Sequence, residues 1–109
     1  MNMLNQIILE GNVENVRTPG DNSLFPAPAV TSLVISTPRT YRDATGKDKE
    51  EVSYFDVEAW GNTGVAASTA KIGQGIRIVG RLKQKRWKDA DDKEYSKVVV
   101  VAEHIEVKP

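Results

Sequence analysis

The chain has 109 residues, no cysteine and a net charge of zero. This length suits one domain that buries a core of its own, and the lack of cysteine excludes disulfides and thiolate metal sites. Apolar runs of a few residues are far shorter than the ~20 that a membrane-spanning helix needs, and no signal peptide is visible at the N-terminus. We therefore expect a single domain over residues 1–109, with no membrane partner and a cytoplasmic location.

The zero net charge hides an uneven distribution. Six Lys and Arg residues, and no acidic residue, lie between Arg77 and Lys88. The acidic residues gather mainly in Asp48–Glu51 and Asp89–Glu94. Because local potential depends on where charges lie rather than on their sum, the basic stretch can still contact phosphates.

Apolar residues recur mostly with a period of two, which indicates strands separated by turn-forming segments. The turns fall in Thr18–Pro28, at Thr45-Gly46-Lys47 within the polar segment Pro38–Glu51, and in Asp89–Asp92. The pattern predicts strands over Met3–Val13, Val30–Thr37, Val52–Trp60, Gly75–Lys88 and Lys93–Val107.

An Ala-rich segment, Asn62–Ile72, predicts a short helix between the third and fourth strands. Asn62 is a possible N-cap, and Gly73 is a stop signal. Strands followed by one short helix before the last two strands is the element order of an OB fold. The expected fold is therefore all-β, a five-stranded Greek-key barrel with one helix.

Side chains alternate between the two faces of a strand, and in the predicted fourth strand one face is basic. Ile76, Ile78 and Leu82 fall on the core face. Charges alone would also suit a solvated edge strand, but a merely solvated face has no use for a tryptophan. We interpret the other face as a binding face, made of Arg77, Arg81, Lys83, Lys85 and Trp87.

The predicted third strand divides in the same way. Phe55, Val57 and Ala59 would face the core, while Tyr54 and Trp60 share the polar face with two acids, Asp56 and Glu58. Stacking of an unpaired base on an aromatic ring is worth about 1–3 kcal/mol and tolerates any base. Packing of Trp60 into the core or a subunit contact is the alternative, and a nucleic-acid path would have to skirt the acids.

Tyr41 lies between two arginines in the polar segment, in the order Arg39-x-Tyr41-Arg42. This arrangement suits a mobile loop that clamps a nucleic-acid strand. An ordinary exposed loop tyrosine fits the spacing equally well.

We expect no enzymatic activity, no metal and no cofactor. His104 is the only histidine, and its parity beside Val98, Val100 and Ala102 predicts a partly buried strand residue. No carboxylate pair, glycine-rich phosphate loop or metal-ligand spacing stands out.

Several stretches, in this order, resemble the bacterial single-stranded DNA-binding protein (SSB) family and together cover nearly the whole chain. They are Asn5–Asn12, Ser36-Thr37 leading to Tyr41-Arg42-Asp43, Tyr54–Gly61, Gly80–Asp89 and Tyr95–Ala102. The resemblance implies an OB fold that binds and protects single-stranded DNA in replication, recombination and repair, at the nucleoid. It also implies a homo-oligomer, with the tetramer as the usual form of the family.

The resemblance further implies base stacking at four positions, Tyr41, Tyr54, Trp60 and Trp87. It places Arg81, Lys83, Lys85, Arg86 and Lys88 along the basic fourth strand of the family. Together with Arg39, Arg42 and Arg77, these residues are the predicted phosphate-binding set.

The sequence also departs from the family pattern. Thr18–Pro28 is unusual, and the chain ends at Pro109, where the family continues into a linker and an acidic tip that recruits replication and repair proteins. Such partners are therefore expected only if a tail exists beyond Pro109. Two alternatives stay open: a primosome-type, PriB-like OB interaction module, which would have lost the stacking aromatics, and an RNA-binding OB domain.

Overall fold

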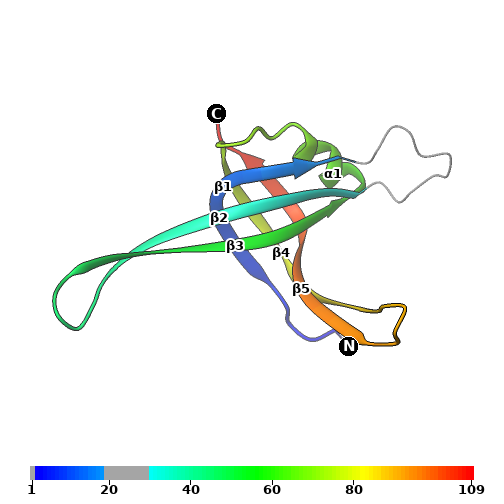
Figure 1. Cartoon of the computed structure of the whole chain (residues 1–109). Coiled ribbons are helices and arrows are strands. Elements are labelled where there is room, and N and C mark those ends of the chain that lie inside the picture. The colour runs from blue at the N-terminus through cyan, green and yellow to red at the C-terminus, as the bar shows by residue number, and fades with distance from the viewer. Residues whose placement is uncertain (1, 19–29) are drawn as a thin grey trace.

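The computed structural model describes residues 2–18 and 30–109, in which five strands close into a barrel in the order β1-β2-β3-β5-β4 (Figure 1). Neighbouring strands are antiparallel except β3 and β5, which run parallel. The predicted OB fold is confirmed. The elements are β1 (Ile7–Arg17), β2 (Val30–Arg42), β3 (Asp48–Trp60), α1 (Gly61–Ser68), β4 (Gly75–Lys88) and β5 (Glu94–Val107).

The core fills the barrel, and α1 lies against one end of it (Figure 1). The hydroxyl of Thr31 on β2 donates to the Gly64 carbonyl of α1 at 2.9 Å. Gly64 is required there because a Cβ would clash with the Ala59 carbonyl. The largest fully buried side chains are Val13, Leu33, Ile35, Val57, Ile76 and Ile78.

β1 begins and ends four residues later than the predicted Met3–Val13. Before the strand, the Asn5 side chain forms two hydrogen bonds with the backbone of Leu82. Its amide donates to the Leu82 carbonyl at 2.8 Å, and its oxygen accepts from the Leu82 N–H at 3.0 Å. After Val13 a bulge shifts the register with β2, which lets the strand continue to Arg17.

The polar segment Pro38–Glu51 is not the loop that the sequence predicts, because β2 and β3 continue through it as a long hairpin that projects from the barrel (Figure 1). Their register is unbroken from Val30 opposite Trp60 to Arg42 opposite Asp48. Pairing between the two strands satisfies the backbone N–H and C=O groups of these residues, although their side chains show no alternating apolar pattern. Only the predicted turn around Gly46 remains outside the strands.

α1 is shorter than the predicted Asn62–Ile72, and its N-cap is Trp60 rather than Asn62. Gly61 has a φ of +57°, which lets the chain turn from β3 directly into the helix. After the helix, the Gly73 N–H donates to the Val13 carbonyl at 2.7 Å and thereby ties this segment to β1. The residues before Gly73 therefore connect elements instead of extending the helix.

His104 is exposed, so the prediction that it is partly buried is wrong. Val79 pairs with His104 while Gly80 pairs with Ala102, which leaves one extra residue, Glu103, on β5. This bulge inverts the parity of β5 and turns the side chains beyond it to the other face. Gly80 permits the close approach, because a Cβ there would clash with a β5 carbonyl.

Two predicted strands agree closely with the structure: β4 spans the predicted Gly75–Lys88, and β5 begins one residue later than predicted. Within the described parts of the chain, no helix is long and apolar enough to cross a bilayer. The turn-rich residues 19–28 lie outside the described residues.

Candidate nucleic-acid interface

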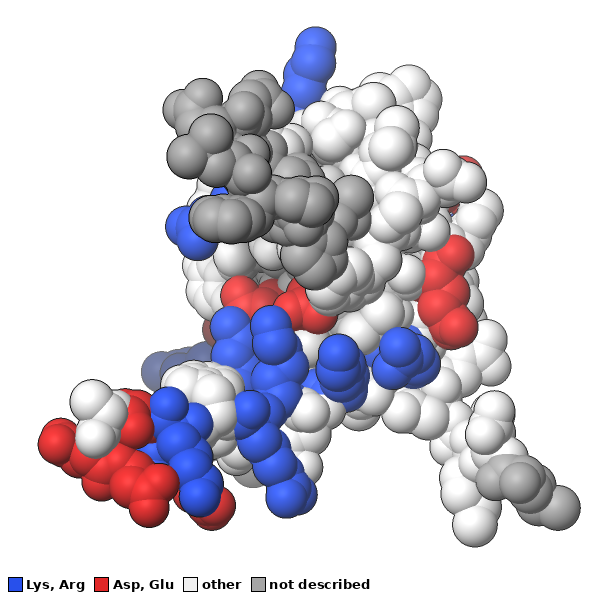
Figure 2. Space-filling model, turned by 90° about the vertical axis from the view of Figure 1, so that its right-hand side faces the viewer, with Lys and Arg blue, Asp and Glu red and all other residues white. Residues whose placement is uncertain are grey.

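The outer face of the β3-β5-β4 sheet gathers residues from both predicted polar strand faces. Strand pairing puts Val99 and Val101 of β5 between the outward side chains of β3 and those of β4. On this side of the molecule, Lys and Arg side chains form a band with acidic side chains beside it (Figure 2). β3 contributes Tyr54, Asp56, Glu58 and Trp60, and β4 contributes Arg81, Lys83, Lys85 and Trp87.

The aromatic side chains on this face are accessible. Tyr54 is 65% exposed, Trp87 48% and Trp60 40%, so Trp60 does not pack into the core of this chain. Phe55, which the sequence predicts as a core residue, is exposed as well. Only Val57–Ala59 of β3 pair with β5. Phe55 lies outside this stretch, so β5 does not cover its ring.

Trp87 has an aromatic partner that the sequence reasoning missed. Tyr95 lies opposite Trp87 in the β4–β5 hairpin, with ring centroids 5.9 Å apart and an interplanar angle of 17°. The Tyr95 hydroxyl donates to Asp89 at 2.9 Å and so fixes the ring against the hairpin turn. The sequence did contain a signal for this contact: if the chain turns at the predicted Asp89–Asp92, Tyr95 lies on the neighbouring strand close to Trp87.

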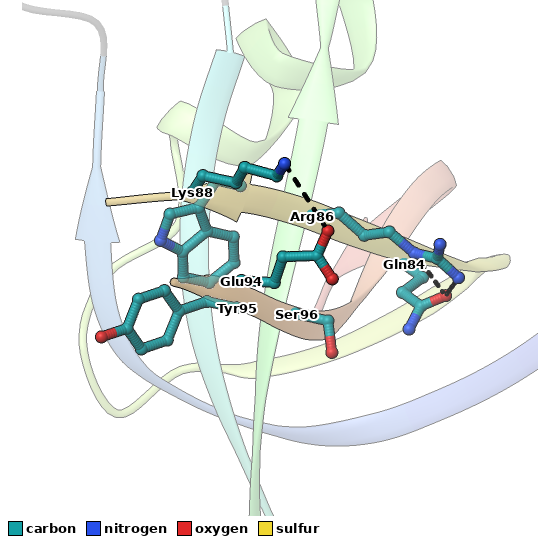
Figure 3. A pocket seen from close by; sticks show the side chains of 7 residues that line it. Gln84, Arg86, Lys88, Glu94, Tyr95 and Ser96 are labelled. Carbon is teal, nitrogen blue, oxygen red and sulfur yellow. Dashed lines mark hydrogen bonds and ion pairs between the residues drawn. The ribbon is translucent and has the colours of Figure 1, made fainter. Parts of the chain in front are cut away.

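A groove of about 490 Å³ runs beside this aromatic pair (Figure 3). Arg86 and Lys88 line it and lie, by strand alternation, on the opposite face of β4 from Lys83 and Lys85. Arg86 donates to the Gln84 side-chain oxygen at 3.0 Å. The hairpin thus carries cations on both of its faces.

Tyr41 does not share a face with Tyr54. Arg39, Tyr41 and Arg42 lie on β2 rather than on a mobile loop, which corrects that interpretation. In the unbroken β2–β3 register Tyr54 pairs with Ser36, so even-numbered positions share one face and Tyr41 lies on the other. The Arg39 guanidinium lies 5.9 Å from the centroid of the Tyr41 ring.

Four of the eight predicted phosphate-binding residues have an acidic partner. Lys85 binds Glu58 at 2.6 Å, and Arg42 lies 3.5 Å from Asp48. Lys88 lies 3.6 Å from Asp92 and 3.9 Å from Glu94, and Arg77 lies 3.2 Å from Glu10. Among the described residues, those of the predicted set without an ion pair are Arg39, Arg81, Lys83 and Arg86.

Arg77 lies at the opposite end of β4 from Trp87. It lies near the start of β4, opposite Glu10 of β1. Glu10 also accepts from Lys108 at 2.8 Å, and the ammonium of Lys108, followed by the guanidinium of Arg77, holds the pKa of Glu10 below its usual value. The structure therefore separates Arg77 from the cations around Trp87.

Two acids lie in the middle of the outer face. Asp56 is half exposed and pairs with Lys97 at 3.0 Å. Glu58 is only 7% exposed, and Lys85 donates to one of its oxygens. Sequence alternation predicts both acids on this face but gives no indication that one of them is buried. Together they interrupt the positive surface between β3 and β4.

The closed barrel, with α1 between β3 and β4, defines the chain as an OB-fold domain. The sequence model of the single-strand binding protein family matches residues 4–108, and the chain belongs to this family.

The relatives extend beyond the matched region. The chain is 31% identical over 107 residues to a single-stranded DNA-binding protein of Aquifex aeolicus, with 94% of this chain and 69% of that protein covered. It is 29% identical over 103 residues to one of Deinococcus radiodurans, of which it spans only 34%, while 94% of this chain is covered. The crystal structure of the wild-type single-stranded DNA-binding protein of Thermus aquaticus, 27% identical, has a TM-score of 0.76 and covers 97% of this chain and 50% of that chain.

Proposed function

We propose that this chain binds and protects single-stranded DNA in replication, recombination and repair, at the nucleoid in the cytoplasm and without catalysis. The observation that carries the proposal is the outer face of the β3-β5-β4 sheet. There, accessible aromatic rings lie on the same face as Arg81 and Lys83, which have no ion pair among the described residues. Stacked rings accept any base, while the cations supply salt-dependent phosphate contacts.

In this proposal the stacked pair of Trp87 and Tyr95 is the main platform for bases, and Tyr54 and Trp60 continue it along β3. Lys83 and Arg81 contact the backbone between the two strands. Lys85 contributes less than its position suggests, because Glu58 already neutralises it at 2.6 Å. Tyr41 and Arg39 contact DNA that passes to the other face of the β2–β3 hairpin.

We also propose that the chain acts as a homo-oligomer, with a tetramer expected from the family. Mass measurement in solution tests this, and a strict monomer would contradict it. Replication and repair proteins are proposed as partners only for a chain that continues past Pro109.

The test of DNA binding is a titration with oligo-dT, followed by tryptophan fluorescence at several salt concentrations. Trp60 and Trp87 are the only indoles in the chain and both are accessible, so we expect strong quenching. The affinity should fall with salt by a log–log slope of about −0.7 for each phosphate contacted. Absence of binding at low salt would overturn the proposal, and tighter binding of oligo-rU than of oligo-dT would favour the RNA alternative.

A further inference from the structure

A bulge in β1 brings Arg17 to the outside of the barrel. Val13 is 1% exposed and faces the core, so regular alternation would turn Arg17 inward as well. The register with β2 shifts between Val13 and Asn15, and Val16 beyond the shift packs against the core. Asn15 and Arg17 therefore lie on the outer side. Arg17 is a surface cation outside the predicted phosphate-binding set.

Strand pairing places Arg17 in one cross-strand row with Ser32 and Glu58. Arg17 pairs with Ser32 of β2, and Ser32 pairs with Glu58 of β3. These three residues line a pocket of about 230 Å³ together with Asn15, Asp56, Lys85 and Lys97. The pocket therefore connects the outer face of the β3-β5-β4 sheet with β2 and β1.

The charges that line this pocket leave one cation without a partner. Lys85 binds Glu58 at 2.6 Å and Lys97 binds Asp56 at 3.0 Å, so each carboxylate already has a counter-charge. Arg17 is exposed and forms no ion pair with any residue that the structure describes. Strand β2 separates it from Glu58, by about 10 Å between the backbones. The β1–β2 side of the pocket is therefore positive, while its β3 side is balanced.

The positive side of the pocket suits a phosphate. The Arg17 guanidinium presents a planar fork of N–H donors that matches phosphate oxygens. Asn15 and Ser32 line the same side, and their amide and hydroxyl groups are among the neutral donors that contact DNA phosphates. Among the described lining residues none is aromatic, so a base would find no ring to stack on. The chemistry of the pocket favours the DNA backbone over a base.

We propose that Arg17, with Asn15 and Ser32, forms a phosphate subsite that extends the DNA path from β4 across β3 to β1. The inference rests on the proposed binding of single-stranded DNA and adds to it one backbone contact. Arg81 and Lys83 hold the backbone on one side of the two neutralised acids, and Arg17 holds it on the other side. The subsite contacts no base, so binding stays independent of sequence.

The test is the salt dependence of binding, measured by fluorescence anisotropy with labelled oligo-dT and oligo-dC. Arg17→Gln should reduce the steepness of the log–log salt dependence by about 0.7, because one phosphate contact is lost. Its loss of affinity should be equal for the two oligonucleotides, since a phosphate carries no sequence information. The matched control is Lys71→Gln, which removes one exposed cation that lines neither of the two pockets and should leave the slope unchanged.

Two further variants separate the charge of the subsite from its shape, and thermal melting shows that each is folded. Arg17→Lys keeps the charge and should keep the slope of the unchanged protein. Ser32→Ala removes a neutral donor, so it should weaken binding about fivefold without changing the slope. An unchanged slope for Arg17→Gln, an equal loss for Lys71→Gln, or a loss confined to one oligonucleotide would overturn the subsite and leave the proposed function intact. Failure of the unchanged protein to bind either oligonucleotide would overturn the proposed function itself.

Discussion

The β2–β3 and β4–β5 hairpins have turns of the same type, but their strands carry different side chains. At the β2–β3 tip, the Asp43 carboxylate accepts from the backbone N–H of Thr45 at 2.9 Å and of Lys47 at 3.0 Å. At the β4–β5 tip, Asp89 accepts from Asp91 and Lys93 at the same two distances. The backbone bonds that close the turns match as well. In both turns an aspartate side chain thus accepts hydrogen bonds from the backbone N–H groups two and four residues later.

The arms of the hairpins diverge. In β4–β5, a stacked aromatic pair lies among cations on both faces. In β2–β3, Tyr41 lies beneath an arginine, on the opposite face from Tyr54, and Arg42 is held by an acid. Under the proposed function, the β4–β5 hairpin is therefore the stronger DNA platform, and the β2–β3 hairpin is a secondary contact.

The largest expected effect concerns the aromatic rings. Trp87→Ala should weaken binding of labelled oligo-dT by about 1–3 kcal/mol, because it removes a base-stacking surface and the partner of Tyr95. Tyr41→Ala should cost less, since its ring already contacts Arg39. Fluorescence anisotropy measures both, and thermal melting of each variant shows whether it is folded. A larger loss for Tyr41→Ala than for Trp87→Ala would reverse the ranking of the hairpins.

The next largest effect is on the free energy of unfolding, and it concerns the residue with a left-handed backbone conformation in each turn. Gly46 has a φ of +84°, whereas Asp92 takes the equivalent place at +63°. A side chain in this region costs roughly 1–2 kcal/mol, less for Asp or Asn. Gly46→Ala should therefore lower the free energy of unfolding by about 1 kcal/mol, and Asp92→Gly should raise it by a few tenths. Urea unfolding of both variants checks the pair, and equal signs would contradict the shared turn geometry.

A smaller effect distinguishes free from paired cations. Lys83→Gln should reduce the steepness of the log–log salt dependence by about 0.7, because one phosphate contact is lost. Arg42→Gln should reduce it less, since Arg42 already lies 3.5 Å from Asp48. Oligo-dT titrations from low to moderate salt provide the slopes. An unchanged slope for Lys83→Gln would place the DNA backbone away from β4.

The smallest effect is the pH dependence of the turns. The Thr45 hydroxyl, then the Lys47 N–H, lowers the pKa of Asp43; the Lys93 N–H, then the Tyr95 hydroxyl, lowers that of Asp89. Because each folded pKa lies below the unfolded value near 4, this stabilisation is complete above about pH 4 and lost as pH falls through the folded pKa.

Asp43→Ala and Asp89→Ala should therefore melt below the unchanged protein at neutral pH, and the gap should narrow in acid. Thermal melts between about pH 6 and pH 2.5 measure this. A gap that stays constant over this range would show that the carboxylate charge does not matter. Of the two, only Asp89→Ala should also weaken DNA binding, because Asp89 positions Tyr95.

Much of the site was predictable because strand alternation is a local property. The sequence predicts the basic face of β4, the placement of Tyr54 and Trp60 on the same face of β3, and the turn around Gly46. It fails at Tyr95, whose importance depends on the ring opposite it in another strand. It also fails at His104, where a single extra residue on β5 inverts the parity.

The sequence by itself determined the barrel, through the period-two pattern, the helix between strands three and four, and the position of most aromatic and basic residues along the strands. Only the tertiary structure decided that polar residues 38–51 continue as strands, because their backbone is satisfied by cross-strand pairing rather than by apolar burial. It alone decided which cations are neutralised and that Glu58 is buried with one free oxygen. Charge pairing and burial depend on residues brought together from distant parts of the chain, and no local pattern records them.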